Sequence, residues 1–163
     1  YALGEIYNQK AVLKNYYLGM DKLSACKQIK KLAESTSPRS LRMDEDFFYY
    51  FGPLFKSYVF FENDKHCGYK AIGKFDSELV IDSLSFKNDK LSKIELSKYS
   101  IDELFGSESL TGSEMADALI LHIPWLPEGL DGDEGGWSYV SQYGWKFFIS
   151  NDKEISITDL SLK

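Results

Sequence analysis

The chain has 163 residues, of which 44% are hydrophobic and 27% charged, and this composition is typical of a folded globular domain. No apolar run approaches the ~18–20 residues of a membrane-spanning helix, so we expect no membrane span within it. The net charge of −6 is concentrated in residues 101–137, which hold nine acidic residues and no lysine or arginine; this argues against nucleic acid as a partner, because binding phosphates needs cations.

The first 35 residues carry the pattern of amphipathic helices. Apolar side chains recur at spacings of three, four or seven residues, at Val12, Tyr16, Leu23, Cys26, Ile29 and Ala33. Gly19, followed by Asp21 as an N-cap, divides this pattern into two predicted helices, at 3–18 and 22–35. Pro38 cannot continue a helix, so the second one ends before it.

The central part of the sequence changes to the pattern of β-strands. A short aromatic run at residues 47–51 is followed by four runs in which apolar and polar residues partly alternate, at 55–62, 66–75, 78–86 and 91–99. The tripeptide Asn-Asp-Lys occurs three times between strand-like runs, at 63–65, 88–90 and 151–153. Because Asn and Asp tolerate the left-handed conformation of tight hairpin turns, the recurrence predicts hairpins in an antiparallel meander.

Two helix starts follow the fifth run. Ser100-Ile-Asp-Glu103 and Thr111-Gly-Ser-Glu114 both have the spacing of a capping box, in which a hydroxyl and a carboxylate satisfy free backbone amides. The first predicts a short turn of helix, and the second predicts a helix that ends near Pro124.

A Pro/Gly-rich acidic loop at 124–136 separates this helix from two last strands, predicted at 137–149, with a kink at Gly144, and at 154–160. No linker or low-complexity segment interrupts the chain, so we predict a single α+β domain over residues 1–163. Its N-terminal helices are expected to pack on a largely antiparallel β-sheet, a meander, with the short helical insertion and the acidic loop before the last strands.

The two cysteines, Cys26 and Cys67, leave two states open. In an exported protein such a pair forms one disulfide, whereas in a cytosolic protein it is two buried thiols. The chain begins at Tyr1 and not at Met, which indicates processing or trimming. We therefore favour an extracytoplasmic location, periplasmic or secreted, with the cytoplasm as the alternative.

Catalytic motifs and cofactor fingerprints are absent from the sequence. His66 and Cys67 are adjacent on a predicted strand and point to opposite faces, so they cannot form a nucleophile–base pair. His122 lies at the end of an apolar helix, where a core or capping role is the ordinary one. We predict no enzymatic activity, no catalytic residue and no cofactor.

The acidic stretch 127–140, PEGLDGDEGGWSYV, has part of the spacing of a calcium loop. Counted from Asp131, the ligand positions 5 and 12 of an EF-hand are occupied by Gly135 and Gln142, so that motif fails. A looser calcium site with Asp131 and Asp133 as ligands is kept as an alternative to a solvated acidic turn.

Tryptophans flank this acidic stretch. Trp125 and Trp137 stand beside proline and glycine and are predicted to be exposed, as aromatic anchors of an interface are. The predicted binding residues are Trp125, Glu128, Asp131, Asp133, Glu134 and Trp137.

These features favour a non-enzymatic protein-binding domain, of the inhibitor or immunity type, that presents residues 101–137 to a basic protein partner. One alternative is a membrane-tethered, pilin-like structural component whose N-terminal anchor has been removed. The third is a small-molecule binder or enzyme with a pocket lined by tyrosine and phenylalanine. The sequence leaves the oligomeric state open.

Overall fold

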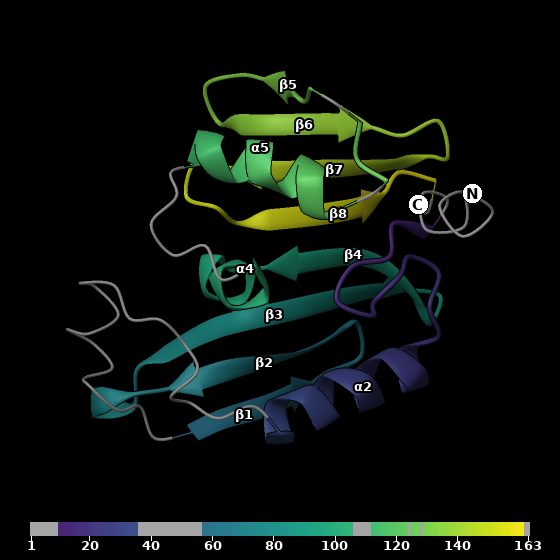
Figure 1. The fold of residues 1–163 in the computed structure, drawn as a ribbon. Coiled ribbons are helices and arrows are strands. Elements are labelled where there is room, and N and C mark those ends of the chain that lie inside the picture. Colours follow the sequence, from purple (N-terminus) through teal and green to yellow (C-terminus); the bar gives the residue numbers. More distant parts are fainter. Residues whose placement is uncertain (1–9, 36–56, 106–111, 124, 128, 162–163) are drawn as a thin grey trace.

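An eight-stranded antiparallel sheet forms the centre of the protein (Figure 1). The computed structural model describes residues 10–35, 57–105, 112–123, 125–127 and 129–161. The strands are β1 (Ser57–Glu62), β2 (His66–Ile72), β3 (Glu78–Lys87), β4 (Lys90–Leu96), β5 (Asp131–Gly132), β6 (Gly136–Val140), β7 (Trp145–Ser150) and β8 (Ile155–Asp159). Their order is β1-β2-β3-β4-β8-β7-β6-β5, so two meanders meet where β4 pairs with β8.

Three helices lie on one face of this sheet (Figure 1). Helix α2 (Lys22–Ser35) contacts β1 and β2, α4 (Lys98–Phe105) contacts β3, and α5 (Gly112–His122) contacts β6 and β7. A disulfide between Cys26 and Cys67 joins α2 to β2, which is one of the two states expected for the cysteines. Within the described residues, no helix is long and apolar enough to cross a membrane.

The alternation along the strands divides their side chains between two faces. One row across all eight strands faces the helices: Phe60, Tyr69, Asp82, Leu96, Ile155, Ile149, Trp137 and Gly132. The adjacent row lies on the opposite face: Phe61, Gly68, Ser83, Glu95, Ser156, Phe148, Ser138 and Asp131. The first row is mostly apolar and belongs to the core, whereas the second is more polar and lies on the open face.

The chain before α2 differs from its prediction. Residues 11–18, expected within a first helix at 3–18, form tight turns in which Lys14 and Asn15 have φ angles of 57° and 67°. Leu13 and Tyr16, on either side of this pair, exchange two backbone hydrogen bonds of 2.9 Å. An α-helix needs negative φ, so the prediction is wrong here, and the expected pair of N-terminal helices is not confirmed. The start of that range, like the predicted strand at 47–51, lies outside the described residues.

A buried polar cluster explains these turns. The Lys14 ammonium lies 2.6 Å from Oδ2 of Asp82 and donates to Oγ of Ser100 at 2.7 Å. The Asp82 side chain is fully buried, and the Tyr16 hydroxyl donates to the same oxygen at 3.4 Å. A buried carboxylate needs a charge partner, which the turns supply by directing Lys14 toward the sheet.

The first predicted capping box is displaced by three residues. Helix α4 begins at Lys98, and Oγ of Ser97 accepts the amide of Ser100 at 3.4 Å, so Ser97 occupies the capping position. Ser100 belongs to the buried cluster instead. The second predicted start is confirmed, because α5 begins at Gly112.

All three Asn-Asp-Lys segments connect neighbouring strands, as predicted. Between β3 and β4, Asn88 and Asp89 have φ angles of 52° and 59°, which fit a two-residue hairpin turn. The single strand predicted at 137–149 is two strands, β6 and β7. The chain reverses between them, and Gly144 has a φ angle of 87°, so its expected kink is a complete turn.

Candidate functional site

The acidic stretch between β5 and β6 forms an ordered turn. Oδ1 of Asp133 accepts the backbone amides of Gly135 at 2.8 Å and Gly136 at 3.1 Å. The Asp133 amide donates to the Gly136 carbonyl at 2.9 Å and closes the hairpin. A Cβ atom at Gly136 would collide with the backbone of Ile149 on β7, so glycine permits this close approach to the next strand.

The turn between β7 and β8 holds this loop in place. The side-chain amide of Asn151 donates to the Glu134 carbonyl at 2.7 Å, and its backbone amide donates to the Gly135 carbonyl at 3.3 Å. The two turns therefore form one unit. We call its acidic residues the acidic end; they are Asp131, Asp133, Glu134, Asp152 and Glu154.

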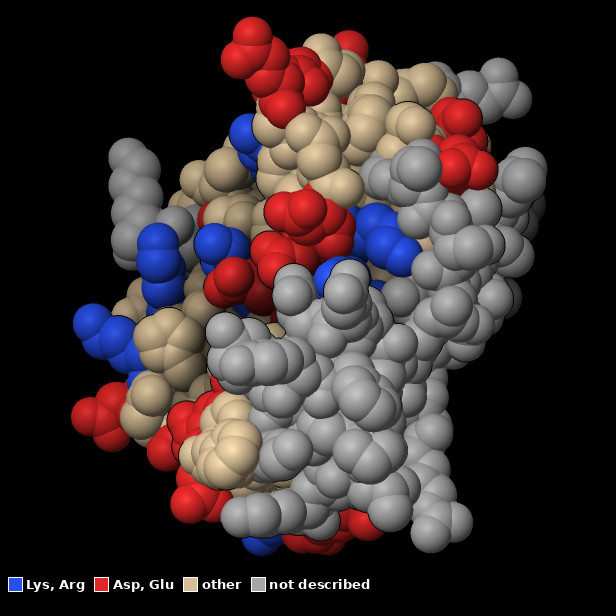
Figure 2. Space-filling model, turned by 90° about the vertical axis from the view of Figure 1, so that its left-hand side faces the viewer, with Lys and Arg blue, Asp and Glu red and all other residues tan. Residues whose placement is uncertain are grey.

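All five residues of the acidic end are exposed. Among the described residues, none of them forms an ion pair with a lysine or arginine. Figure 2 looks onto this end of the sheet, where acidic side chains lie at the top and near the centre of the surface, the central group with basic side chains directly beside it. Five acids against the one lysine of these turns, Lys153, leave a net negative charge and give this surface a negative potential.

The two predicted tryptophan anchors do not belong to an exposed surface. Trp125, expected to be exposed, is 5% exposed, and its indole N–H donates to the Val12 carbonyl at 2.9 Å. Its ring packs edge-on against Trp145 and Phe147, with centroids 5.1 and 6.1 Å away. The prediction for Trp125 is wrong, because the chain after α5 turns this ring into the core. Trp137 is half-buried and also faces the core.

Two other acids of segment 101–137 have described side chains, and both belong to helix α5. Glu114 and Asp117 are exposed on α5, and Glu128 lies outside the described residues. Of the six predicted binding residues, the structure brings Asp131, Asp133 and Glu134 together. It adds Asp152 and Glu154, which are not among the residues predicted from the sequence. Asp152 lies in the third Asn-Asp-Lys turn and Glu154 directly follows it, so the turn was a signal for both.

The calcium alternative gains no support from this geometry. Oδ1 of Asp133 is occupied by two backbone amides, and Asp131 lies opposite Ser138 on the open face of the sheet. In the described part of the chain, no group of three or more His, Cys, Asp or Glu side chains is arranged to hold a metal ion. The bonds to Asp133 account for its role as a turn-forming residue.

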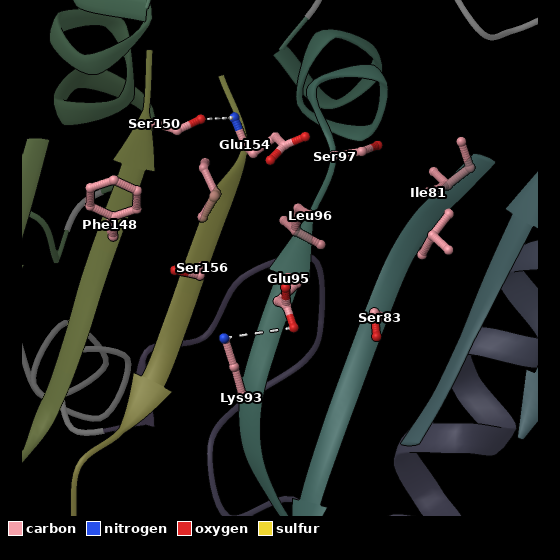
Figure 3. A pocket seen from close by; sticks show the side chains of 12 residues that line it. Ile81, Ser83, Lys93, Glu95, Leu96, Ser97, Phe148, Ser150, Glu154 and Ser156 are labelled. Carbon is pink, nitrogen blue, oxygen red and sulfur yellow. Dashed lines mark hydrogen bonds and ion pairs between the residues drawn. The ribbon is translucent and has the colours of Figure 1, made fainter. Parts of the chain in front are cut away.

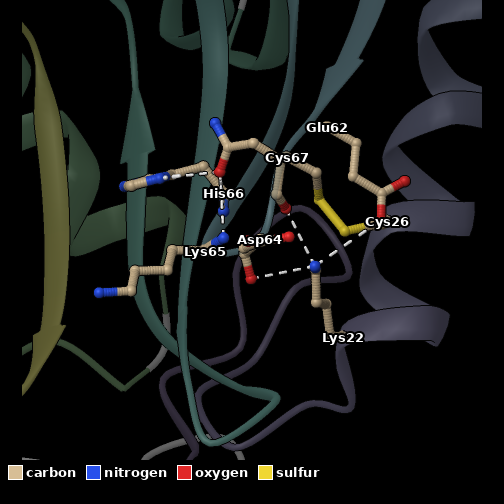
Figure 4. The surroundings of a disulfide bond; sticks show 8 residues. Lys22, Cys26, Glu62, Asp64, Lys65, His66 and Cys67 are labelled. Atoms are coloured by element: carbon tan, nitrogen blue, oxygen red, sulfur yellow. Dashed lines mark hydrogen bonds and ion pairs between the residues drawn. A yellow bond between two sulfur atoms is a disulfide. The ribbon is translucent and has the colours of Figure 1, made fainter.

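The disulfide region is a structural connection between α2 and the first hairpin (Figure 4). Cys67 is buried whereas His66 is exposed, so these neighbours point to opposite faces, as predicted. Lys22 donates to the carbonyls of Asn63 and Asp64 at 3.0 and 3.1 Å and ties the helix start to the turn. The side chain of His122 lies outside the described residues.

Comparisons of the chain with protein-family models, curated proteins and solved structures find no match.

Proposed function

We propose that the protein is a non-enzymatic protein-binding domain, of the inhibitor or immunity type, whose acidic end receives a basic protein partner. The observation that carries this proposal is the exposure of five carboxylates on two turns that hydrogen-bond to each other. Their charge is not compensated by ion pairs with described lysines or arginines.

The fixed conformation of the acidic end supports the proposed binding of a partner. Asp133 and Asn151 hold the loop in one conformation, so less conformational entropy is lost when a partner binds. Unpaired carboxylates raise the rate at which a cationic surface arrives in the correct orientation. This attraction extends over about 8 Å at physiological ionic strength, so a partner needs its basic side chains near the contact.

The test compares two variants with equal net charge. The first neutralises the acidic end through Asp131→Asn, Glu134→Gln and Asp152→Asn, and it retains Asp133 because that carboxylate holds the turn. The control neutralises three exposed acids of the turns at the opposite end of the sheet, through Glu62→Gln, Asp64→Asn and Asp89→Asn.

Proteins captured from the native source by the wild type are purified, and their affinities for the three forms are measured by calorimetry. We expect a basic partner whose affinity falls about tenfold with the first variant and changes by less than about twofold with the control. A partner that binds all three forms equally, or that is lost equally with both variants, would contradict the proposal.

A further inference from the structure

The open face of the sheet contains a groove beside the acidic end (Figure 3). Its volume is about 320 Å³, and it extends across β3, β4, β8 and β7. The lining includes two carboxylates, Glu95 and Glu154, the small hydroxyl side chains of Ser83 and Ser156, and the ring of Phe148. Glu154 belongs to both the groove and the acidic end, so the two surfaces are continuous.

The register of the strands produces this hollow. Glu95 on β4 stands directly opposite Ser83 on β3 and Ser156 on β8. Two short side chains therefore flank the carboxylate and leave space on both sides of it. Phe148 on β7 is opposite Ser156 and places a half-buried aromatic ring at the border of the hollow.

The groove has an excess of hydrogen-bond acceptors with negative charge. Its charged lining side chains are two glutamates and one lysine, so the lining carries a net negative charge. Lys93 lies 3.8 Å from Glu95, but both side chains are 41–50% exposed, so this pair contributes little. Glu154 has no ion pair with a described residue, and its carboxylate extends from the start of β8 toward Ser97 (Figure 3).

We propose that this groove binds an arginine side chain of the basic partner, an inference that rests on the function proposed above. A guanidinium presents five N–H donors in one plane and pairs with carboxylates through two parallel hydrogen bonds. Glu154 directly precedes β8 and is two residues from Ser156, the partner of Glu95, a diagonal spacing of roughly 7–8 Å between backbone positions. The Glu95 carboxylate is turned toward Lys93 and that of Glu154 toward Ser97 (Figure 3), so a guanidinium held between them requires both exposed side chains to rotate toward it. The ring of Phe148 adds a surface on which guanidinium stacks.

This assignment supplies the anchor that the tryptophans do not provide. Arginine is enriched among the residues that carry most of the energy of an interface. The exposed carboxylates of the acidic end then attract the partner, and the groove fixes its position. Lysine fits less well, because its compact ammonium has three donors and no plane to stack.

The experiment titrates the protein with hexa-arginine amide and hexalysine amide at 0.15 M salt, by calorimetry and by amide chemical shifts. We expect shifts at residues 95–97 and 154–156, and about tenfold tighter binding of the arginine peptide. Glu95→Gln/Glu154→Gln is expected to weaken arginine binding about tenfold, and Glu62→Gln/Asp64→Asn by less than about twofold.

Equal affinity for both peptides, or shifts confined to residues outside the groove, would overturn the proposal. Binding of a neutral probe such as cellohexaose in the groove, without binding of the arginine peptide, would overturn it as well. The purified partner separates the two proposals: if neutralising Asp131, Glu134 and Asp152 weakens binding and Glu95→Gln/Glu154→Gln does not, the groove assignment fails and the proposed function stands. If neither variant weakens binding, both fail.

Discussion

Asp82 is the residue that governs how the chain runs before α2. It occupies a position in the core-facing row of the sheet where its neighbours on β2 and β4 are Tyr69 and Leu96. A charge at this position needs a cation, and Lys14 supplies it through turns with positive φ. The helical spacing of the surrounding apolar residues gives no sign of this pairing, because the two residues are 68 positions apart.

Replacing Lys14 tests the importance of this pair. Lys14→Met leaves the buried carboxylate without its cation, so we expect the free energy of unfolding to fall by roughly 3–5 kcal/mol in urea denaturation. Lys93→Met removes an exposed pair and is expected to cost about 0–1 kcal/mol. Equal losses in the two variants would show that Lys14 does not compensate a buried charge.

Tyr16 gives the fold a dependence on alkaline pH. Burial, followed by the charge of Asp82 and the hydrogen bond to it, raises the pKa of Tyr16 far above its usual value. In the unfolded chain a tyrosine ionises near pH 10, so above that pH the unfolded state binds fewer protons than the folded state. The stability contributed below pH 10 is therefore lost as the pH rises through the alkaline range.

Urea denaturation between pH 10 and 11.5 measures this effect. We expect the wild type to lose stability with pH more steeply than Tyr16→Phe, by about 1.4 kcal/mol per pH unit. Tyr143→Phe changes an exposed tyrosine and is expected to retain the wild-type slope. Parallel slopes for the wild type and Tyr16→Phe would contradict this account.

At the scale of elements, hairpins were predictable and the junctions between elements were not. The Asn-Asp-Lys turns carry their own conformational signal, but it acts differently in each: Asn88 and Asp89 adopt positive φ, the Asn63 side chain accepts the amides of Lys65 and His66, and in the third turn Lys153 has the positive φ. Gly144 also adopts positive φ, which glycine does readily. The apolar residues before and after it nevertheless favoured the prediction of one strand with a kink. Trp125 was misplaced because a tryptophan beside proline and glycine has no local feature that distinguishes a loop surface from a core position.

The contact between the two acidic turns is the element-level feature on which the proposed function rests. Asn151→Ala removes the hydrogen bond to the Glu134 carbonyl. We expect a loss of roughly 1 kcal/mol in stability and faster hydrogen exchange at the amides of Gly135 and Gly136. Partner affinity should fall as the loop loses its fixed conformation.

Asn63→Ala provides the matched control, since it removes the side chain of the same residue type from the first Asn-Asp-Lys turn. That variant is expected to leave exchange at Gly135 and Gly136 unchanged. If Asn151→Ala also leaves exchange at these amides unchanged, the β5–β6 loop does not depend on its neighbour.

At the scale of the whole molecule, the pairing of β4 with β8 joins two meanders into one sheet. This pairing connects strands about 60 residues apart and has no local signal, so the antiparallel meander was predictable and the strand order was not. The pairing also determines the surface on which the proposed function rests. The pairing places Glu154 diagonally across from Glu95 in the groove, and Asn151 of the adjacent β7–β8 turn contacts the β5–β6 loop.

The strand directions also separate the turns into two ends. The β1–β2 and β3–β4 turns lie at one end of the sheet, and the β5–β6 and β7–β8 turns lie at the other (Figure 1). Asp64 and Asp89 at the first end are interspersed with Lys22, Lys65 and Lys90. The acidic end has one lysine in its turns, Lys153, for five acids, so attraction of a basic partner is expected there more than at the opposite end.

The ionic-strength dependence of association tests this central claim most directly. The association rate constant of the purified partner is measured by stopped-flow between 20 mM and 0.5 M salt, for the wild type and for the variant with Asp131, Glu134 and Asp152 neutralised. We expect the wild-type rate to fall by at least about tenfold across this range, and the variant to show a much weaker dependence. A wild-type rate that does not change with salt, or equal dependence in both forms, would contradict the account.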